Sequence, residues 1–168
     1  IVVHIPFAEP FCPVLSQILL EAAKETGASV HPKGTYVVME GPAFSTKAES
    51  RLYRSWGADI IGMTALPEAK LAREAEICYA SIAGVTDYDS WQEQSEPLVV
   101  DVILNILRQN VDTIKKIIKL AVDRIPEERR CGCATALKAA FVTAPKFMPP
   151  EQKQKLNLLI GKYLKGDS

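Results

Sequence analysis

Residues 80–90 read Ala-Ser-Ile-Ala-Gly-Val-Thr-Asp-Tyr-Asp-Ser, an apolar run that ends in two aspartates, Asp87 and Asp89. Because these are two positions apart, an extended backbone would place both side chains on one face. Two carboxylates held together cannot both ionise freely, so one would keep its proton near neutral pH and could act as a general acid. Alternatively, Asp87 opens a turn and Asp89 caps the next helix. The spacing alone leaves both interpretations open.

The segments around this run alternate between strand and helix patterns. Strands are expected at 35–39, 60–63 and 78–85, and the end of another at 2–5. Strands that alternate with helices predict an α/β fold, with a mixed, partly parallel sheet flanked by helices. Ligands gather at the carboxyl ends of strands in such sheets, so Thr64 and Asp87 would lie at the same edge.

Helix signals are strongest at two points. Pro13 suits the first turn of a helix whose apolar stripe stops at Gly27. Thr46 and Glu49 have the spacing of a capping box, which predicts a helix from there to about Trp56. Further helices are expected at 67–75, 99–125, 134–142 and 151–164. The segment 99–125 is amphipathic and is expected to cover a face of the sheet.

Composition favours one globular domain. The chain has 168 residues, 48% of them apolar, which is enough for a core of ordinary size. Its 20 basic and 20 acidic residues cancel, so no general attraction to nucleic acid or to anionic membranes is implied. No apolar run approaches the roughly 20 residues of a membrane span, and these residues contain no basic segment followed by an apolar one, the pattern of a signal segment. We therefore expect a cytoplasmic protein that recognises a small ligand locally.

Four cysteines occur, at positions 12, 78, 131 and 133, without the paired spacing of a four-ligand zinc site. The apolar surroundings of Cys12 and Cys78 predict buried thiols. A bridge between Cys131 and Cys133 would close a small, strained ring. The alternative is two free thiols at the start of a helix.

Several short stretches, taken in chain order, carry a resemblance to a known family. They read His-Ile-Pro at 4–6, Met-Glu-Gly-Pro-Ala-Phe-Ser at 39–45, Glu-Ser at 49–50, Trp-Gly-Ala-Asp-Ile-Ile-Gly-Met-Thr at 56–64 and Thr-Asp-Tyr-Asp at 86–89. In this order the set closely resembles the C-terminal part of 5'-methylthioadenosine phosphorylases, within the trimeric purine nucleoside phosphorylase family. The resemblance covers about Val3 to Leu107. It implies a purine nucleoside phosphorylase-like fold that is incomplete at the N-terminus.

The resemblance implies a pentosyltransferase that uses phosphate to split 5'-methylthioadenosine into adenine and 5-methylthioribose 1-phosphate, a step of purine and methionine salvage. Inorganic phosphate is a co-substrate, and no cofactor or metal is implied. Asp87 and Asp89 match the base-binding pair of the family. A carboxylic acid can donate a proton to purine N7, and a carboxylate can accept a hydrogen bond from the 6-amino group. Related enzymes that act on 6-oxopurines use an asparagine, so two aspartates indicate an aminopurine.

Further positions match family residues that contact the base, the sugar and the phosphate. Phe44 and Ser45 match residues that lie along the base and sugar, and Met63 matches a methionine packed against the ribose. Thr64 matches a threonine that donates to phosphate. From the residues alone, Phe44 and Met63 could instead be core residues, and Thr64 an ordinary residue at the end of a strand.

The methylthio group requires an apolar pocket. Val100, Ile103 and Leu104 match the lining of that pocket, although they could also be simply the buried stripe of a helix. His4 matches a histidine contributed across a subunit interface, which implies a homotrimer or a higher assembly.

The family's N-terminal half carries a glycine-containing phosphate loop and an Arg-His pair, and neither occurs in this sequence. We therefore expect residues 1–168 to be the C-terminal part of one phosphorylase domain, which pairs with the missing N-terminal half and alone binds phosphate poorly. No nucleic-acid or membrane partner is expected. The alternatives are a purine nucleoside phosphorylase of broader or 6-oxopurine specificity, and a noncatalytic nucleoside-binding subunit.

Overall fold

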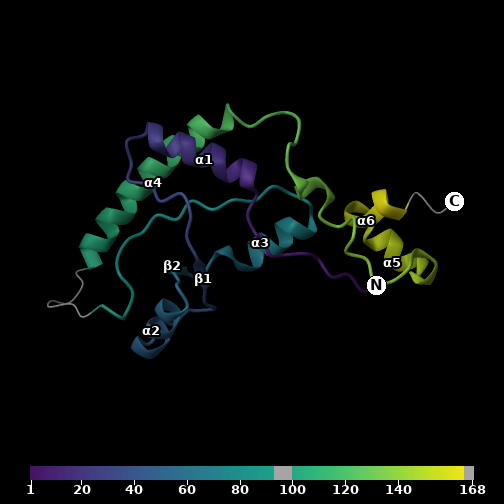
Figure 1. The fold of residues 1–168 in the computed structure, drawn as a ribbon, viewed down its shortest axis with the longest axis horizontal. Coiled ribbons are helices and arrows are strands. Elements are labelled where there is room, and N and C mark those ends of the chain that lie inside the picture. The colour runs from purple at the N-terminus through teal and green to yellow at the C-terminus, as the bar shows by residue number, and fades with distance from the viewer. Residues whose placement is uncertain (93–99, 165–168) are drawn as a thin grey trace. The chain divides into compact units, whose positions relative to one another are not determined.

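The computed structural model describes residues 1–92 and 100–164. The chain forms two compact units: unit 1 comprises residues 1–15, 67–80 and 127–168, and unit 2 comprises residues 16–66 and 81–126. Figure 1 shows the elements, which in chain order are α1 (Pro13–Glu25), β1 (Tyr36–Val38), α2 (Lys47–Ser55), β2 (Ile60–Gly62), α3 (Ala65–Glu74), α4 (Val100–Val122), η1 (Gly132–Thr135), η2 (Pro145–Phe147), α5 (Pro150–Lys155) and α6 (Asn157–Leu164).

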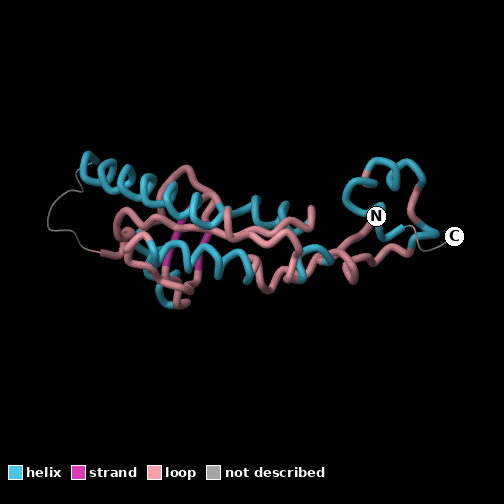
Figure 2. The backbone as a smooth tube through the Cα atoms, turned by 90° about the horizontal axis from the view of Figure 1, so that it is seen from above, coloured by secondary structure: helices cyan, strands magenta, loops and turns pink. Residues whose placement is uncertain are grey.

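The sheet of unit 2 is a parallel pair. Tyr36 of β1 lies opposite Ile60 of β2, and Val38 lies opposite Gly62. The two strands run side by side in Figure 2. Parallel strands need a crossover connection, and α2 supplies it. The expected α/β class is confirmed, with two strands in the described part of the sheet.

Two other expected strands do not form within the described residues. Residues 78–85 have no strand pairing, and residues 2–5 contribute only an isolated antiparallel bridge to Phe141. A strand exists only where a neighbour exchanges backbone hydrogen bonds with it, and apolar content does not reveal that neighbour. The carbonyl of Val85 accepts instead from the side-chain amide of Asn110, at 2.9 Å.

The ends of α1 and α2 follow the local signals. Thr46 caps α2: its hydroxyl accepts from the Glu49 N–H at 3.2 Å, and its own N–H donates to the Glu49 carboxylate at 2.8 Å. α2 ends in a Schellman turn, in which the Gly57 N–H donates to the Arg54 carbonyl at 2.9 Å. Gly57 has a φ of +79°, and Gly27 after α1 has a φ of +75°. Glycine adopts this left-handed conformation without a steric penalty.

α4 is the long amphipathic helix that the sequence predicts, although its expected first residue, Val99, lies outside the described residues. The buried side chains Ile117 and Ala121 of α4 pack against Ala22 and Ala23 of α1. These four residues form the core cluster of unit 2.

The C-terminal segment differs from the expected helices. The expected helix at 134–142 does not form: residues 134 and 135 end η1, and residues 136–140 form turns in which the Lys138 N–H donates to the Thr135 carbonyl at 3.0 Å, a 3₁₀-type bond. These turns place Leu137 in a core with Ile160 of α6. The expected helix at 151–164 is divided into α5 and α6 at Leu156.

The four cysteines lie together in unit 1 as free thiols. Cys12 and Cys133 are buried, whereas Cys78 and Cys131 are half-buried, with sulfurs 3.4 Å apart. Burial and the neighbouring thiols raise the pKa of Cys78 to about 12 and that of Cys133 to about 11. Burial also acts on Cys131, but hydrogen bonds from the Cys133 N–H and from the other thiols lower its pKa to about 7. Cys131 and Cys133 are thus two thiols at the start of η1, the second of the two expected arrangements.

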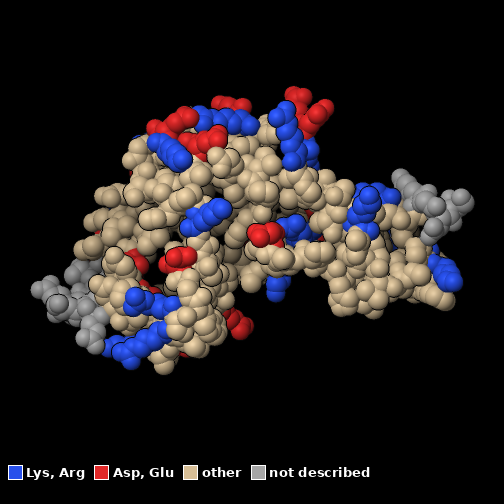
Figure 3. All heavy atoms as spheres, viewed as in Figure 1, with Lys and Arg blue, Asp and Glu red and all other residues tan. Residues whose placement is uncertain are grey.

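Charged groups of both signs intermingle on the face of the molecule shown in Figure 3, in keeping with the formal net charge of zero. Within residues 1–92 and 100–164, every helix is too short or too polar to cross a membrane.

α3 ends in the same type of turn as α2, but with a glutamate where α2 has glycine. Glu76 has a φ of +55°. Its N–H donates to the Arg73 carbonyl at 3.1 Å, and the Ile77 N–H donates to the Ala72 carbonyl at 2.8 Å. A residue with a Cβ is strained in this conformation, so its side chain should make compensating contacts.

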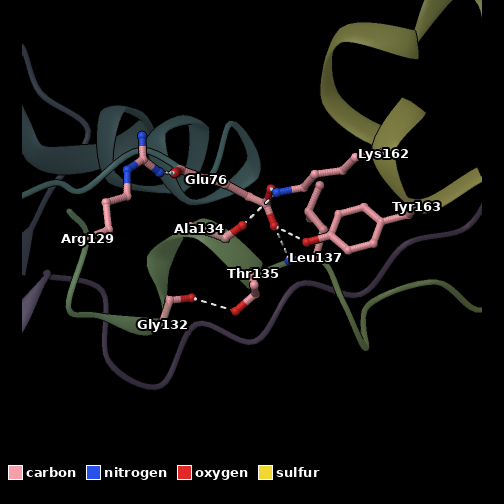
Figure 4. A network of polar contacts seen from close by, with 8 residues as sticks. All are labelled: Glu76, Arg129, Gly132, Ala134, Thr135, Leu137, Lys162 and Tyr163. Atoms are coloured by element: carbon pink, nitrogen blue, oxygen red, sulfur yellow. Dashed lines mark hydrogen bonds and ion pairs between the residues drawn. The ribbon is translucent and has the colours of Figure 1, made fainter. Parts of the chain in front are cut away.

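The Glu76 carboxylate is the centre of a polar network in unit 1 (Figure 4) and is only 6% exposed. One oxygen accepts from the Leu137 N–H at 3.0 Å and from the Tyr163 hydroxyl at 2.5 Å, and the other forms an ion pair with Lys162. Burial raises the pKa of Glu76, but these hydrogen bonds outweigh burial and hold the pKa below its ordinary value. The network joins the end of α3 to α6.

Replacing Glu76 by Gln should lower the free energy of unfolding by about 1–3 kcal/mol near neutral pH, because a buried acceptor loses its charge and its ion pair. A carboxyl whose pKa is lower in the folded than in the unfolded chain stabilises the fold above the unfolded pKa. That contribution disappears as the pH falls through the folded pKa. The difference between wild type and E76Q should therefore shrink below pH ~4 in urea unfolding experiments.

The exposed Glu128, also in unit 1, provides the matched control, and Glu128→Gln should leave the stability almost unchanged. A difference between wild type and E76Q that does not depend on pH would contradict the electrostatic role of Glu76.

Candidate active site

The loops that follow β1 and β2 meet at the carboxyl edge of the parallel pair. The Met39 N–H donates to the Gly62 carbonyl at 2.9 Å, which continues the strand pairing by one bond. Gly41 then takes a φ of +75°, and a Cβ at this position would lie 2.6 Å from the sulfur of Met63. The positive φ favours glycine here, and any larger residue would also require the Met63 side chain to shift. Met63 lies against the loop that leads to Ser45.

Ser45 joins this loop to the segment that carries the aspartates. Its hydroxyl donates to Asp89 Oδ1 at 2.5 Å, and its carbonyl accepts from the Ser90 hydroxyl at 2.7 Å. Ser45 is only 6% exposed. Two segments 44 residues apart in the sequence are thereby held in contact.

Residues of α2 support the aspartate segment. Ser50 is buried, hydrogen-bonds Asp89 and accepts from the Trp91 N–H at 3.2 Å. The guanidinium of Arg54 lies over the Trp91 ring, 3.6 Å from its centroid. Sequence reasoning assigned no role to Ser50, Arg54 or Trp91. Two signals were available for Ser50: the Glu-Ser pair at 49–50 belongs to the stretches that carry the resemblance, and a small polar residue lies just inside a capped helix. Neither by itself indicates a contact with the aspartates.

Asp89 is an ionised carboxylate in this environment. Burial raises its pKa, but hydrogen bonds from Ser45, Ser50 and Ser90 outweigh burial and hold the pKa below its ordinary value. The expectation that one aspartate of the pair keeps its proton did not specify which one, and these hydrogen bonds favour the charged form of Asp89. Near neutral pH this side chain can only accept hydrogen bonds.

Asp87 has different surroundings. It is exposed and accepts from the Thr86 hydroxyl at 2.5 Å, and within the described residues it shares no donor with Asp89. The Gln92 N–H donates to the Asp89 carbonyl at 3.1 Å, so the turn in this segment begins at Asp89, whereas the alternative interpretation had Asp87 open it.

The remaining sequence-predicted residues of unit 2 differ in exposure. Phe44 is 85% exposed, so its ring is not a core residue. Met63 is half-buried and Thr64 is exposed. On the first turns of α4, Val100 is 67% exposed, Leu104 is 40% exposed and Ile103 is half-buried. These three side chains are therefore not simply the buried stripe of the helix.

His4 belongs to unit 1, whereas the other predicted site residues belong to unit 2. It is exposed, and its backbone N–H donates to the Ala140 carbonyl at 2.8 Å. Its side chain lines a surface hollow together with Phe7, Lys70 and Glu74.

The family model of the phosphorylase superfamily matches residues 2–123, which include the parallel strand pair and the segment of Asp87 and Asp89. The chain belongs to this superfamily. The S-methyl-5'-thioadenosine phosphorylase of Geobacter sulfurreducens is 56% identical over 164 residues, which are 98% of this chain and 57% of the relative. The protein of the same name from Koribacter versatilis is 47% identical, and this chain covers 56% of its length. The chain thus spans little more than half the length of these relatives.

Solved structures show the same similarity. A methylthioadenosine phosphorylase from an Antarctic soil metagenomic library is 44% identical with a TM-score of 0.85, over 94% of this chain and 56% of that chain. Another similar structure is a variant of the adenosine/methylthioadenosine phosphorylase of Schistosoma mansoni in complex with methylthioadenosine. It is 39% identical with a TM-score of 0.69, over 76% of this chain and 49% of that chain. The expected fold family is therefore confirmed.

Replacing Ser45 by Ala should raise the pKa of Asp89 toward its ordinary value, because the carboxylate loses one of the donors that favour its charged form. NMR titration of the aspartate side-chain carbons measures this change. Thr86→Ala is the matched control: it removes a hydroxyl donor from Asp87 and should leave the titration of Asp89 unchanged. An unaltered Asp89 titration in S45A would mean that the hydrogen bond does not form in solution.

Proposed function

We propose that this chain supplies the base- and sugar-binding part of an enzyme that cleaves 5'-methylthioadenosine with phosphate. The observation that carries the proposal is Asp89, held ionised by Ser45 and two positions from Asp87, in a member of the phosphorylase superfamily. Solved relatives in complex with methylthioadenosine and with adenine support an adenine nucleoside as substrate.

The two aspartates take different parts in the reaction. A phosphate oxygen attacks the anomeric carbon of the ribose, the bond from carbon to nitrogen breaks, and its electron pair moves onto the purine. Protonation at N7 stabilises the departing base. Asp87, in its acid form, donates this proton, and Asp89 accepts a hydrogen bond from the 6-amino group. The donors around Asp89 favour its charged form, which leaves the acid role to Asp87.

The neighbouring side chains hold the rest of the substrate. The exposed ring of Phe44 contacts the base and sugar, and Ser45 lies beside it. Met63 packs against the ribose and Thr64 donates to phosphate. The apolar side chains at the start of α4 receive the methylthio group; these are Val100, Ile103 and Leu104.

Activity requires more than these residues. The chain spans 57% of the Geobacter sulfurreducens relative, and in the family the phosphate loop and the Arg-His pair lie in the N-terminal half. We infer that this chain acts together with such a half, in a homotrimer or a higher assembly where His4 reaches the site of a neighbouring subunit.

The proposal is tested by adenine release from 5'-methylthioadenosine and phosphate. Two preparations are compared: the chain alone, and the chain joined to the N-terminal portion of the Geobacter sulfurreducens relative. The joined protein should release adenine only when phosphate is present, and the chain alone should release little. Faster cleavage of inosine would favour a 6-oxopurine enzyme, and adenine binding without turnover would favour a noncatalytic subunit. Rapid release by the chain alone would contradict the need for the N-terminal portion.

Replacing Asp87 by Asn in the joined protein should reduce the turnover of 5'-methylthioadenosine by on the order of 10²-fold or more, because the amide keeps the shape but cannot transfer the proton. Cleavage of inosine should fall less, since an amide can donate a hydrogen bond to a 6-oxygen. Asp112→Asn, at an exposed position on α4, is the matched control. Equal turnover in D87N and wild type would leave Asp87 as a turn residue only.

A further inference from the structure

A second cluster of reactive side chains lies in unit 1, and the proposed reaction does not use it. It consists of the four cysteines, whose Sγ atoms all lie within 4.8 Å of one another. They come from three separate segments: Cys12 directly precedes α1, Cys78 follows α3, and Cys131 and Cys133 lie at the start of η1.

We propose that these four sulfurs bind one zinc ion in a closed tetrahedral site. A Zn–S distance of about 2.3 Å puts the sulfurs at the corners of a tetrahedron about 3.8 Å apart. The observed separations, 3.4 Å between Cys78 and Cys131 and no more than 4.8 Å for any pair, bracket that value.

The four sulfur ligands determine which metal binds and whether the site is structural or catalytic. Four thiolates are soft ligands that favour zinc over magnesium or calcium. Zinc readily adopts the tetrahedral arrangement that four such ligands form. Because the protein supplies all four ligands, no coordination position is left for water or substrate. The site is therefore structural rather than catalytic.

Backbone groups around the cluster favour thiolates. The Leu15 N–H points to the sulfur of Cys12 at 3.5 Å, and the Cys133 N–H hydrogen-bonds the sulfur of Cys131. Such donors stabilise a negatively charged sulfur more than a neutral one. Arg129 and Arg130 immediately precede Cys131 in the sequence, and their positive charge would offset the net negative charge of a zinc tetrathiolate.

The position of the cluster shows what the metal would stabilise. Cys12 and Cys133 are 1% and 5% exposed. The Cys12 N–H also donates to the Tyr79 carbonyl at 2.7 Å, so a backbone hydrogen bond already joins two of the three segments. Unit 1 is assembled from segments far apart in the sequence around a small core, and a metal that joins all three would add directly to its folding free energy.

Binding releases protons and needs no oxidant. Each thiol that coordinates zinc gives up its proton to solvent, and no electron is transferred. Disulfide formation, by contrast, removes electrons and requires an oxidant. Metal affinity should therefore increase with pH, whereas a disulfide-linked cluster would bind no metal until it is reduced.

The test uses the 168-residue chain, purified under reducing conditions without chelator. Elemental analysis and native mass spectrometry should find one zinc per chain. After removal of zinc, added Co²⁺ should produce the strong absorption of cobalt–thiolate charge transfer. Cys131→Ser should reduce metal affinity by more than the 10–100-fold that loss of an outer-shell partner costs. His31→Ala is the matched control: it removes one of only two histidines but no sulfur, and should leave metal binding unchanged.

The proposal is overturned if the reduced, metal-free wild-type chain binds Co²⁺ without thiolate absorption, or takes up no zinc. Masses that reveal disulfides, with no metal uptake after reduction, would likewise overturn it. These results do not depend on whether C131S folds, because they are measured on the wild-type chain. They are also independent of adenine release, so failure of the proposed reaction would not affect them.

Discussion

The hydrogen bond from Ser45 to Asp89 is the contact on which the candidate site depends. Both side chains are short, so the bond requires two backbones 44 residues apart to approach closely. Ser45 directly precedes the Thr46 cap, and Ser50 lies just inside the same helix. A local signal for the start of α2 thus positions two donors for one carboxylate. The position and the charge of Asp89 therefore have a common origin in the way this helix begins.

The sequence predicted those elements whose signals are local. The Thr46 capping box, the glycine after α1 and the apolar spacing of α4 each act within a few residues, and the helices formed accordingly. The expected strand at 78–85 did not form, because pairing depends on a distant partner that composition does not specify. The helix expected at 134–142 became short turns that serve a core contact, again a non-local requirement.

Candidate functional residues show the same division. Motif order brought Asp87, Asp89 and Ser45 to attention, but only the structure assigns the charged state of Asp89, because that state arises from serines of two other segments. Spacing argued against a four-cysteine site. The structure nevertheless gathers Cys12 and Cys78 with the Cys-Gly-Cys segment, because spacing rules describe ligands on one hairpin or loop and these ligands come from three segments.

Glycine would suit the backbone at position 76 better than glutamate does, as it does at the end of α2. A stabilisation strategy that selects residues by backbone angles alone would choose glycine there, for a gain of at most about 1–2 kcal/mol. It would remove the buried acceptor that serves Leu137, Lys162 and Tyr163, and the loss would exceed the gain. In engineering this protein, a strained residue should be taken as a reason to examine its side chain before the backbone is relaxed.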